Sequence, residues 1–230
     1  MGAAAALRVD IEGATLRVPA SAWSLPGFRT WVTSLDLPAA ARATFVDGEV
    51  LVDLSPESIE SHNKVKLALT VGVAEIVQTD DLGEVYPDRA LLTHPRAGVS
   101  TEPDLCFASW ETLSSGRVRF TKRAGRDDEY IEIVGTPDLV VEIVSDSSED
   151  KDLRRLRSAY ARAKIPEYWL VDARGPRVAF SILRLGRGGY RASAPADRPQ
   201  TSTVLGRVVK LERTKNRVGS WTYRVRSTAA

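Results

Sequence analysis

The sequence predicts an α/β fold in which a mixed β-sheet core is flanked by helices, with extra antiparallel strands at the N and C termini. Two observations lead to this prediction. A strand–helix–strand unit spans residues 136–175, and strand-like segments lie on both sides of it. The 230 residues suffice to bury one sizeable core. We therefore expect an N-terminal extension at 1–40 packed on the core, a core at 41–175, and a C-terminal β extension of the same domain at 176–230.

The first elements are short. Residues 7–18 read as a strand pair turned at Glu12-Gly13, and "LPGFRTWVTSLD" at 25–36 reads as a helix. Residues 42–56 read as a hairpin, because two alternating runs flank Asp47-Gly48, a strong two-residue turn signal.

A longer helix is predicted at 55–80, where Ser55 can cap the first turn and Pro56 suits it. One stripe repeats at steps of three and four residues: Ile59, His62, Lys66, Leu69, Val73 and Ile76. His62 and Lys66 therefore occupy one end of an otherwise apolar helix face.

The central part of the chain alternates strands with one basic helix. Strand signals occur at 83–94, 101–109 and 137–145, and a hairpin with a polar tip is predicted within 117–135. A helix at 149–163 then carries an apolar stripe of Leu153, Leu156, Tyr160 and Ala163. It is followed by the strand "EYWLVDA", and a unit of this length favours parallel strands with a right-handed crossover.

Glu142 interrupts a run of hydrophobic residues, "LVVEIVS", that is typical of a strand covered on both faces. A buried, unpaired carboxylate costs several kcal/mol, so it needs a metal ion, a role as a base, or a salt bridge. Asp104 is a second acid at the start of a strand, and two carboxylates on neighbouring strands bind a hard cation such as Mg²⁺. Spacing alone leaves open that Glu142 pairs with an arginine and Asp104 caps a turn.

Composition and charge narrow the class of protein. No apolar run approaches the roughly 20 residues of a membrane span, and the signal-peptide pattern is missing, so we expect a cytoplasmic protein without a membrane partner. Cys106 is the single cysteine, which excludes an intrachain disulfide. Basic residues cluster at 151–164 and 207–226 despite a net charge of +2. These clusters either meet phosphate or form solvated faces.

Four blocks, "DGEVLVDLSPESIESHNKVKLAL", "EPDLCF", "TPDLVVEIVSDSS" and "KDLRRLRSAYARAKIPEYWLVDAR", resemble the Uma-two family of restriction-endonuclease-like proteins. That family belongs to the superfamily whose active site is written PD-(D/E)XK. The resemblance runs from about Asp47 to Gly175. It implies a restriction-endonuclease-like core in which Asp104 and Glu142 hold Mg²⁺ or Mn²⁺ and act in catalysis. Glu49 and His62 are additional candidates for the same site.

The sequence departs from the superfamily pattern at Val144, where a lysine is expected two residues after Glu142. Many relatives carry a substitute lysine on the following helix, but Leu156 stands there. Lys151 remains as a candidate catalytic residue, because its side chain is long enough to point back toward the acids. The alternative is a surface lysine paired with a neighbouring acid. Arg154, Arg155 and Arg157 are candidate phosphate contacts, unless that helix face is merely solvated.

The resemblance implies a metal-dependent endonuclease that hydrolyses DNA phosphodiester bonds. An alternative is a catalytically impaired nucleic-acid-binding protein that retains the fold, which the missing lysine favours. A third is a scaffold that binds a protein partner. Restriction-like enzymes often pair to cut both strands, so the resemblance also implies a homodimer.

Overall fold

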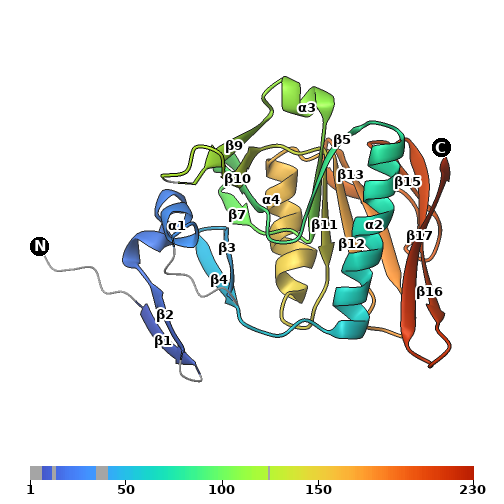
Figure 1. The fold of residues 1–230 in the computed structure, drawn as a ribbon, viewed down its shortest axis with the longest axis horizontal. Helices are drawn as coiled ribbons and strands as arrows, with labels where there is room; N and C mark the ends of the chain where they lie inside the picture. Colours follow the sequence, from blue (N-terminus) through green and yellow to red (C-terminus); the bar gives the residue numbers. More distant parts are fainter. Residues whose placement is uncertain (1–6, 12–13, 35–40, 124) are drawn as a thin grey trace, which may run out of the picture.

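The computed structural model describes residues 7–11, 14–34, 41–123 and 125–230. Two six-stranded mixed sheets form its centre, and a three-stranded antiparallel sheet covers one side (Figure 1). The predicted α/β fold, with a mixed sheet flanked by helices and extra antiparallel strands, is confirmed. No helix among these residues is both long enough and apolar enough to cross a membrane.

The strands group as follows. The first sheet has the order β4-β3-β7-β6-β10-β9 and comprises β3 (Arg42–Val46), β4 (Glu49–Asp53), β6 (Leu91–His94), β7 (Val99–Thr101), β9 (Val118–Lys122) and β10 (Tyr130–Gly135). The second has the order β14-β13-β12-β11-β8-β5 and comprises β5 (Gly83–Pro87), β8 (Leu105–Ser109), β11 (Leu139–Ile143), β12 (Glu167–Asp172), β13 (Ala179–Gly186) and β14 (Gly189–Ala192). The third comprises β15 (Gln200–Ser202), β16 (Arg207–Lys215) and β17 (Trp221–Ala229). Near the N terminus, β1 (Leu7–Ile11) pairs with β2 (Ala14–Val18).

The helices are short apart from one. They are α1 (Leu25–Val32), α2 (Lys64–Thr79), α3 (Trp110–Ser114) and α4 (Arg157–Arg162). Single 3₁₀ turns lie at Ala20–Trp23 and Pro95–Ala97. Two π-helical segments lead into the helices that flank the second sheet: Ile59–Asn63 precedes α2, and Lys151–Leu156 precedes α4.

The second sheet is covered on both faces because β11 alternates between two cores. Val141 and Ile143 pack with the apolar face of α2, whereas Val140 packs with Ala159 and Tyr160 of α4. All five residues of β11 are buried, Glu142 included, as the hydrophobic run around it predicts. The predicted parallel pairing across the crossover is confirmed, because β11 and β12 run parallel.

Several local predictions hold. Asp47 and Gly48 both adopt positive φ, 53° and 79°, which is the conformation of a type I′ turn between β3 and β4. The predicted hairpin of β9 and β10 is also present. Residues 7–18 form the predicted strand pair, although its turn at Glu12-Gly13 lies outside the described residues.

The predicted start of the long helix is wrong. Asp53 Oδ1 accepts a hydrogen bond from the Ser55 N–H at 2.8 Å, which turns the chain after β4 and leaves the next residues non-helical. Ser58, not Ser55, caps the helical segment by accepting from the Ser61 N–H. Glu57 therefore lies in a connecting segment, free to point across to α2.

The predicted stripe of the basic helix is wrong at its first position. Leu153 is partly exposed, whereas Leu156, Tyr160 and Ala163 are buried as predicted. The π-helical segment explains the difference, because its wider turn shifts the phase of the side chains that precede α4. The same segment buries the carboxylate of Asp152.

Candidate active site

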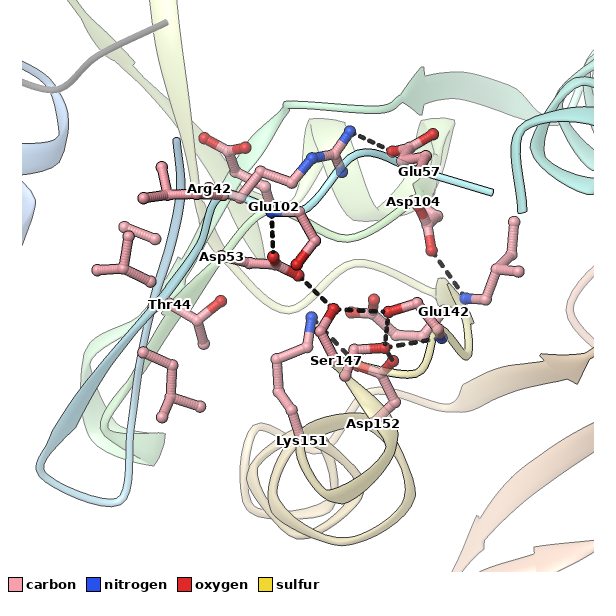
Figure 2. Close-up of a pocket in the computed structure, with 18 of the residues that line it drawn as sticks. Arg42, Thr44, Asp53, Glu57, Glu102, Asp104, Glu142, Ser147, Lys151 and Asp152 are labelled. Carbon is pink, nitrogen blue, oxygen red and sulfur yellow. Dashed lines mark hydrogen bonds and ion pairs between the residues drawn. The ribbon is translucent and has the colours of Figure 1, made fainter. Parts of the chain in front are cut away.

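A cavity of about 700 Å³ opens where the second sheet meets the β3–β4 hairpin. Its walls come from β3, β4, the segment before α2, the entry to β8, the end of β11 and the π-helical segment before α4 (Figure 2). Of the residues predicted for the site, five line this cavity: Asp104, Glu142, Lys151, His62 and Arg155.

Asp104 and Glu142 come together because their strands are neighbours. β8 and β11 are antiparallel with Leu105 opposite Val141, so one further step along each strand leads to Asp104 and Glu142. Both side chains are deeply buried, with exposed fractions of 5% and 2% for the residues. The two acids therefore reach the same cavity from adjacent strands.

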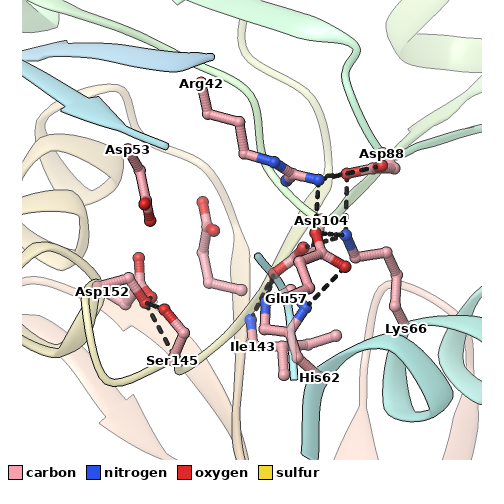
Figure 3. Close-up of polar contacts among 12 residues, drawn as sticks. Arg42, Asp53, Glu57, His62, Lys66, Asp88, Asp104, Ile143, Ser145 and Asp152 are labelled. Atoms are coloured by element: carbon pink, nitrogen blue, oxygen red, sulfur yellow. Dashed lines mark hydrogen bonds and ion pairs between the residues drawn. The ribbon is translucent and has the colours of Figure 1, made fainter. Parts of the chain in front are cut away.

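The side chain of Asp104 has three polar neighbours. Its Oδ2 accepts a hydrogen bond of 2.7 Å from the Ile143 N–H, and its Oδ1 lies 3.2 Å from Lys66 Nζ. The His62 Nε2 lies 3.6 Å from Oδ2. The sequence had placed His62 and Lys66 on one helix stripe, and the structure shows that this end of the stripe points at Asp104 (Figure 3).

Lys66 lies at the centre of a larger ionic network. Its ammonium is 2.5 Å from Glu57 Oε1 and 3.1 Å from Asp88 Oδ1, in addition to its contact with Asp104. Arg42 pairs with Glu57 and Asp88 from the other side. Burial alone would lower the pKa of Lys66, but the charges of the three acids outweigh it and raise that pKa above its ordinary value. The lysine thus acts as an internal cation among three carboxylates.

Glu142 has a different environment on the α4 side of the sheet. The Tyr160 hydroxyl donates a 2.5 Å hydrogen bond to Glu142 Oε1. Burial raises the pKa of Glu142 well above its ordinary value, Lys151 opposes that shift, and the charges of Asp152 and Asp104 reinforce it. Burial is likewise the largest cause that raises the pKa of Asp152. These two acids therefore hold protons more readily than exposed carboxyls do, even with Lys151 beside them.

Lys151 is the cation nearest to this second group of acids. Its side chain is 23% exposed, its Nζ lies 3.2 Å from Asp152 Oδ1, and it points into the cavity beside Glu142 (Figure 2). The charges of Glu142 and Asp152 raise the pKa of Lys151 against the lowering effect of burial. The structure thus places Lys151 in the cavity wall, paired with an acid that also faces the cavity.

The remaining predicted residues lie elsewhere. Glu49 is outside the cavity wall and forms an ion pair with Arg155 at the rim. Arg154 is exposed and pairs with Asp150, while Arg157 donates to the Tyr190 carbonyl at 2.9 Å. Arg155 is thus the member of the three arginines that reaches the cavity.

Buried ligand atoms without a hydrogen-bond partner, one of them 3.4 Å from a carboxylate oxygen of Glu57, suit a cation in this cavity. Among the described residues, His62 Nδ1 and Glu102 Oε2 are buried without a hydrogen-bond partner, and both residues line the cavity. Ligand atoms of Glu57, His62 and Asp104 lie within 4.8 Å of one another. Oxygen and imidazole donors at this density fit a divalent ion such as Mg²⁺ or Mn²⁺.

Sequence reasoning missed several cavity residues. Glu57, Asp152 and Glu102 were given no role, although Glu57 and Asp152 each neighbour a residue that was considered. Tyr160 was predicted only as part of an apolar stripe, and its hydrogen bond to Glu142 was missed. Asp138, four residues before Glu142, lies outside the cavity wall and has a structural role: it accepts hydrogen bonds from the Ser109 N–H at 2.7 Å and the Thr112 hydroxyl at 2.9 Å. Val144 is buried, and its N–H donates to the Val171 carbonyl.

The mixed α/β sheet with its flanking helices is the architecture of restriction-endonuclease-like proteins. The profile of one such family, described as "Uma2: Putative restriction endonuclease", matches residues 31–212, and the chain belongs to this family. A similar solved structure is the crystal structure of "a putative nuclease belonging to DUF820" from Anabaena variabilis. It is 14% identical, the match covers 79% of this chain and 90% of that chain, and the TM-score is 0.57. The comparison with curated proteins found no match.

Proposed function

We propose that this protein is a metal-dependent endonuclease that hydrolyses DNA phosphodiester bonds. The observation that supports it most is the convergence of the buried Asp104 and Glu142 on one open cavity, next to the ammonium of Lys151. Membership of a restriction-endonuclease-like family agrees with this reaction.

In this proposal, Asp104 and Glu142 hold a Mg²⁺ or Mn²⁺ ion. The bound ion would polarise the scissile phosphodiester and lower the pKa of a water molecule. Tyr160 donates to one oxygen of Glu142 and so fixes the orientation of that carboxylate. The Ile143 N–H does the same for Asp104. Both acids are thus fixed in position before a ligand arrives, which avoids a cost of reorganisation.

Lys151 supplies the positive charge that the superfamily pattern places at position 144, where this chain has a valine. Its charge is retained, because Glu142 and Asp152 raise its pKa. An ammonium in this position can hold a water molecule by hydrogen bonding and stabilise negative charge that develops on the phosphoryl group. Arg155, at the rim of the cavity, is positioned to contact a phosphate outside the reacting one.

The second candidate is a nucleic-acid-binding protein with impaired catalysis. One observation favours it: the Lys66 ammonium already lies among Glu57, Asp88 and Asp104, and neutralises part of the charge that a metal ion would require. A metal ion that binds Asp104 would then have to compete with this lysine.

Cleavage assays separate the two candidates. Supercoiled plasmid is incubated with the protein and Mg²⁺ or Mn²⁺, beside the variants Asp104→Asn and Glu142→Gln. Each variant is expected to cut about 10²-fold or more slowly than the parent, because each removes one charged ligand of the ion. Asp146→Asn is the matched control, since Asp146 is exposed and lies outside the cavity wall.

The outcomes are distinct. Metal-dependent cutting that both site variants lose, and that the control retains, supports the nuclease. A parent that binds DNA yet leaves it intact with every divalent ion tried contradicts the nuclease and favours the impaired binding protein.

A further inference from the structure

The C-terminal hairpin of β16 and β17 is a basic ribbon, which we define as residues 207–226. Its basic residues are Arg207, Lys210, Arg213, Lys215, Arg217, Arg224 and Arg226, against the single acid Glu212. β15 pairs with β16 only as far as Val209, so the rest of the ribbon is two-stranded. All of its second strand lies beyond the residues that match the family profile, which end at 212.

Part of this charge is used within the protein. Arg207 pairs with Asp80, and Lys210 and Arg226 share Glu212. Arg213 donates to the carbonyls of the β12–β13 loop. In contrast, no carboxylate of the described residues lies within ion-pair distance of Lys215, Arg217 or Arg224, and all three side chains are exposed. These three cations therefore remain available to a ligand.

These three cations, which have no carboxylate partner among the described residues, lie on both faces and at the turn of the ribbon. Lys215 shares a face with Trp221, and its Nζ lies 3.6 Å from the centre of that ring. Arg224 is on the opposite face, because its neighbour Val225 packs toward Gly72 of α2. Arg217 is in the turn beside Val218, which is 80% exposed. A ribbon with charge on both faces and an apolar tip suits a groove between two phosphate backbones.

The ribbon is hydrogen-bonded to the first turns of the helical segment that leads into α2. Glu60 accepts a 3.0 Å hydrogen bond from the Trp221 N–H, and Lys64 donates to the Trp221 carbonyl at 3.1 Å. His62, between these two residues, lines the cavity. The turn of the ribbon therefore lies at the same end of the molecule as the start of α2 (Figure 1). One extended ligand could touch both the ribbon and the cavity.

We propose that this ribbon is a docking surface for duplex DNA, which Lys215, Arg217 and Arg224 contact through its phosphates. This inference rests on the proposed function, because it names the partner of the same site. Charge complementarity selects a polyanion. The major groove of B-form DNA admits a two-stranded ribbon, whereas the groove of A-form RNA is too narrow. Duplex DNA therefore fits the ribbon better than duplex RNA does.

The test is a binding measurement in EDTA, so that it works whether or not the protein cleaves. Fluorescence anisotropy with a labelled duplex DNA is recorded over a range of salt concentrations for the parent and for the triple variant Lys215→Gln, Arg217→Gln, Arg224→Gln. The control is Arg187→Gln, Arg191→Gln, Arg198→Gln, which removes equal charge from exposed positions outside the ribbon. Thermal melting checks that each variant folds.

The ribbon variant is expected to bind at least about ten times more weakly at low salt, and its slope of log K against log salt should fall by about 2–3, because each lost phosphate contact removes about 0.9. The control should keep the parent slope. An unchanged slope in the ribbon variant, or equal affinity of the parent for duplex RNA, would overturn the inference. If the parent binds DNA through the ribbon but does not cleave it, the ribbon is a DNA-docking surface and only the proposed nuclease activity is contradicted.

Discussion

The Tyr160 hydroxyl donates a 2.5 Å hydrogen bond to Glu142 within a fully buried part of the core, where α4 crosses β11. This contact gives the carboxyl group of Glu142 a hydrogen-bond partner in the middle of a hydrophobic strand. It lowers the pKa of Glu142 and so opposes the effect of burial, which raises it. The tyrosine therefore helps to keep the acid ready for a cation.

Replacing Tyr160 with Phe removes this hydrogen bond, and the pKa of Glu142 is then expected to rise further. Since the site needs the carboxylate form, the acidic limb of the pH profile of DNA cleavage should move to higher pH. Protein stability should fall by about 1–3 kcal/mol, the range for a lost hydrogen bond to a carboxylate. A pH profile with the same acidic limb as the parent would contradict this role of Tyr160.

Replacing Lys151 with Met tests the proposed substitute for the missing lysine. We expect cleavage to slow by about 10²–10³-fold, a typical cost for losing one group that stabilises the transition state. DNA binding in EDTA should stay near that of the parent. Lys122→Met is the control, because Lys122 is exposed and lies outside the cavity. Equal cleavage by the Lys151 variant and the control would show that Lys151 has no catalytic role.

Replacing Lys66 with Met removes the internal cation from Glu57, Asp88 and Asp104. Stability in EDTA should drop by about 3 kcal/mol or more, since breaking a buried ion pair leaves charge uncompensated. A divalent ion should then replace the lost charge, so the gain in melting temperature on adding Mn²⁺ should exceed that of the parent. A smaller gain than in the parent would contradict the competition between Lys66 and the metal.

The pH dependence of stability follows from the raised pKa values of Glu142 and Asp152. A carboxyl whose pKa is higher in the folded state binds protons more readily when folded. Its contribution is fully present below the ordinary pKa near 4 and is lost as pH rises through the higher folded value. In EDTA, the melting temperature should therefore fall as pH is raised from this ordinary range toward neutrality.

Glu142→Gln should flatten this dependence, because the amide does not titrate. Opposite contributions come from Glu57 and Asp88, whose pKa values are lowered by Lys66 and Arg42 despite burial. The stability that Glu57 and Asp88 contribute is lost only below the ordinary carboxyl range, as pH falls through their lowered pKa values. The contribution of Glu142 is lost above that range, so the two effects occur at different pH. An equally steep fall in the Glu142→Gln variant would contradict the assignment.

Local sequence patterns were sufficient to predict some of the structural elements. Asp47-Gly48 predicted a two-residue hairpin turn, which has type I′ geometry, and the strand–helix–strand unit predicted the parallel pair of β11 and β12. The hydrophobic residues on both sides of Glu142 predicted a strand buried on both faces. Each of these features depends on residues that are close in sequence, and the sequence pattern therefore predicted each of them correctly.

Other features depend on tertiary contacts that no local pattern contains. Glu57 and Asp88 reach Lys66 from separate segments, so their network was invisible in the sequence. The π-helical segment before α4 changed which side chains face inward, and it buried Asp152. Ser55 matched the pattern of a helix cap, but its N–H donates to Asp53, so the helical segment begins after Ser58 instead. The predicted homodimer remains a prediction.

The most direct test is a crystal of the protein soaked in Mn²⁺ and measured for anomalous scattering. We predict a peak in contact with carboxylate oxygens of both Asp104 and Glu142, and its loss in an Asp104→Asn crystal. A soaked crystal with no peak between these two acids, and with Lys66 still seated on Asp104, would contradict the proposal that this cavity holds a catalytic metal ion.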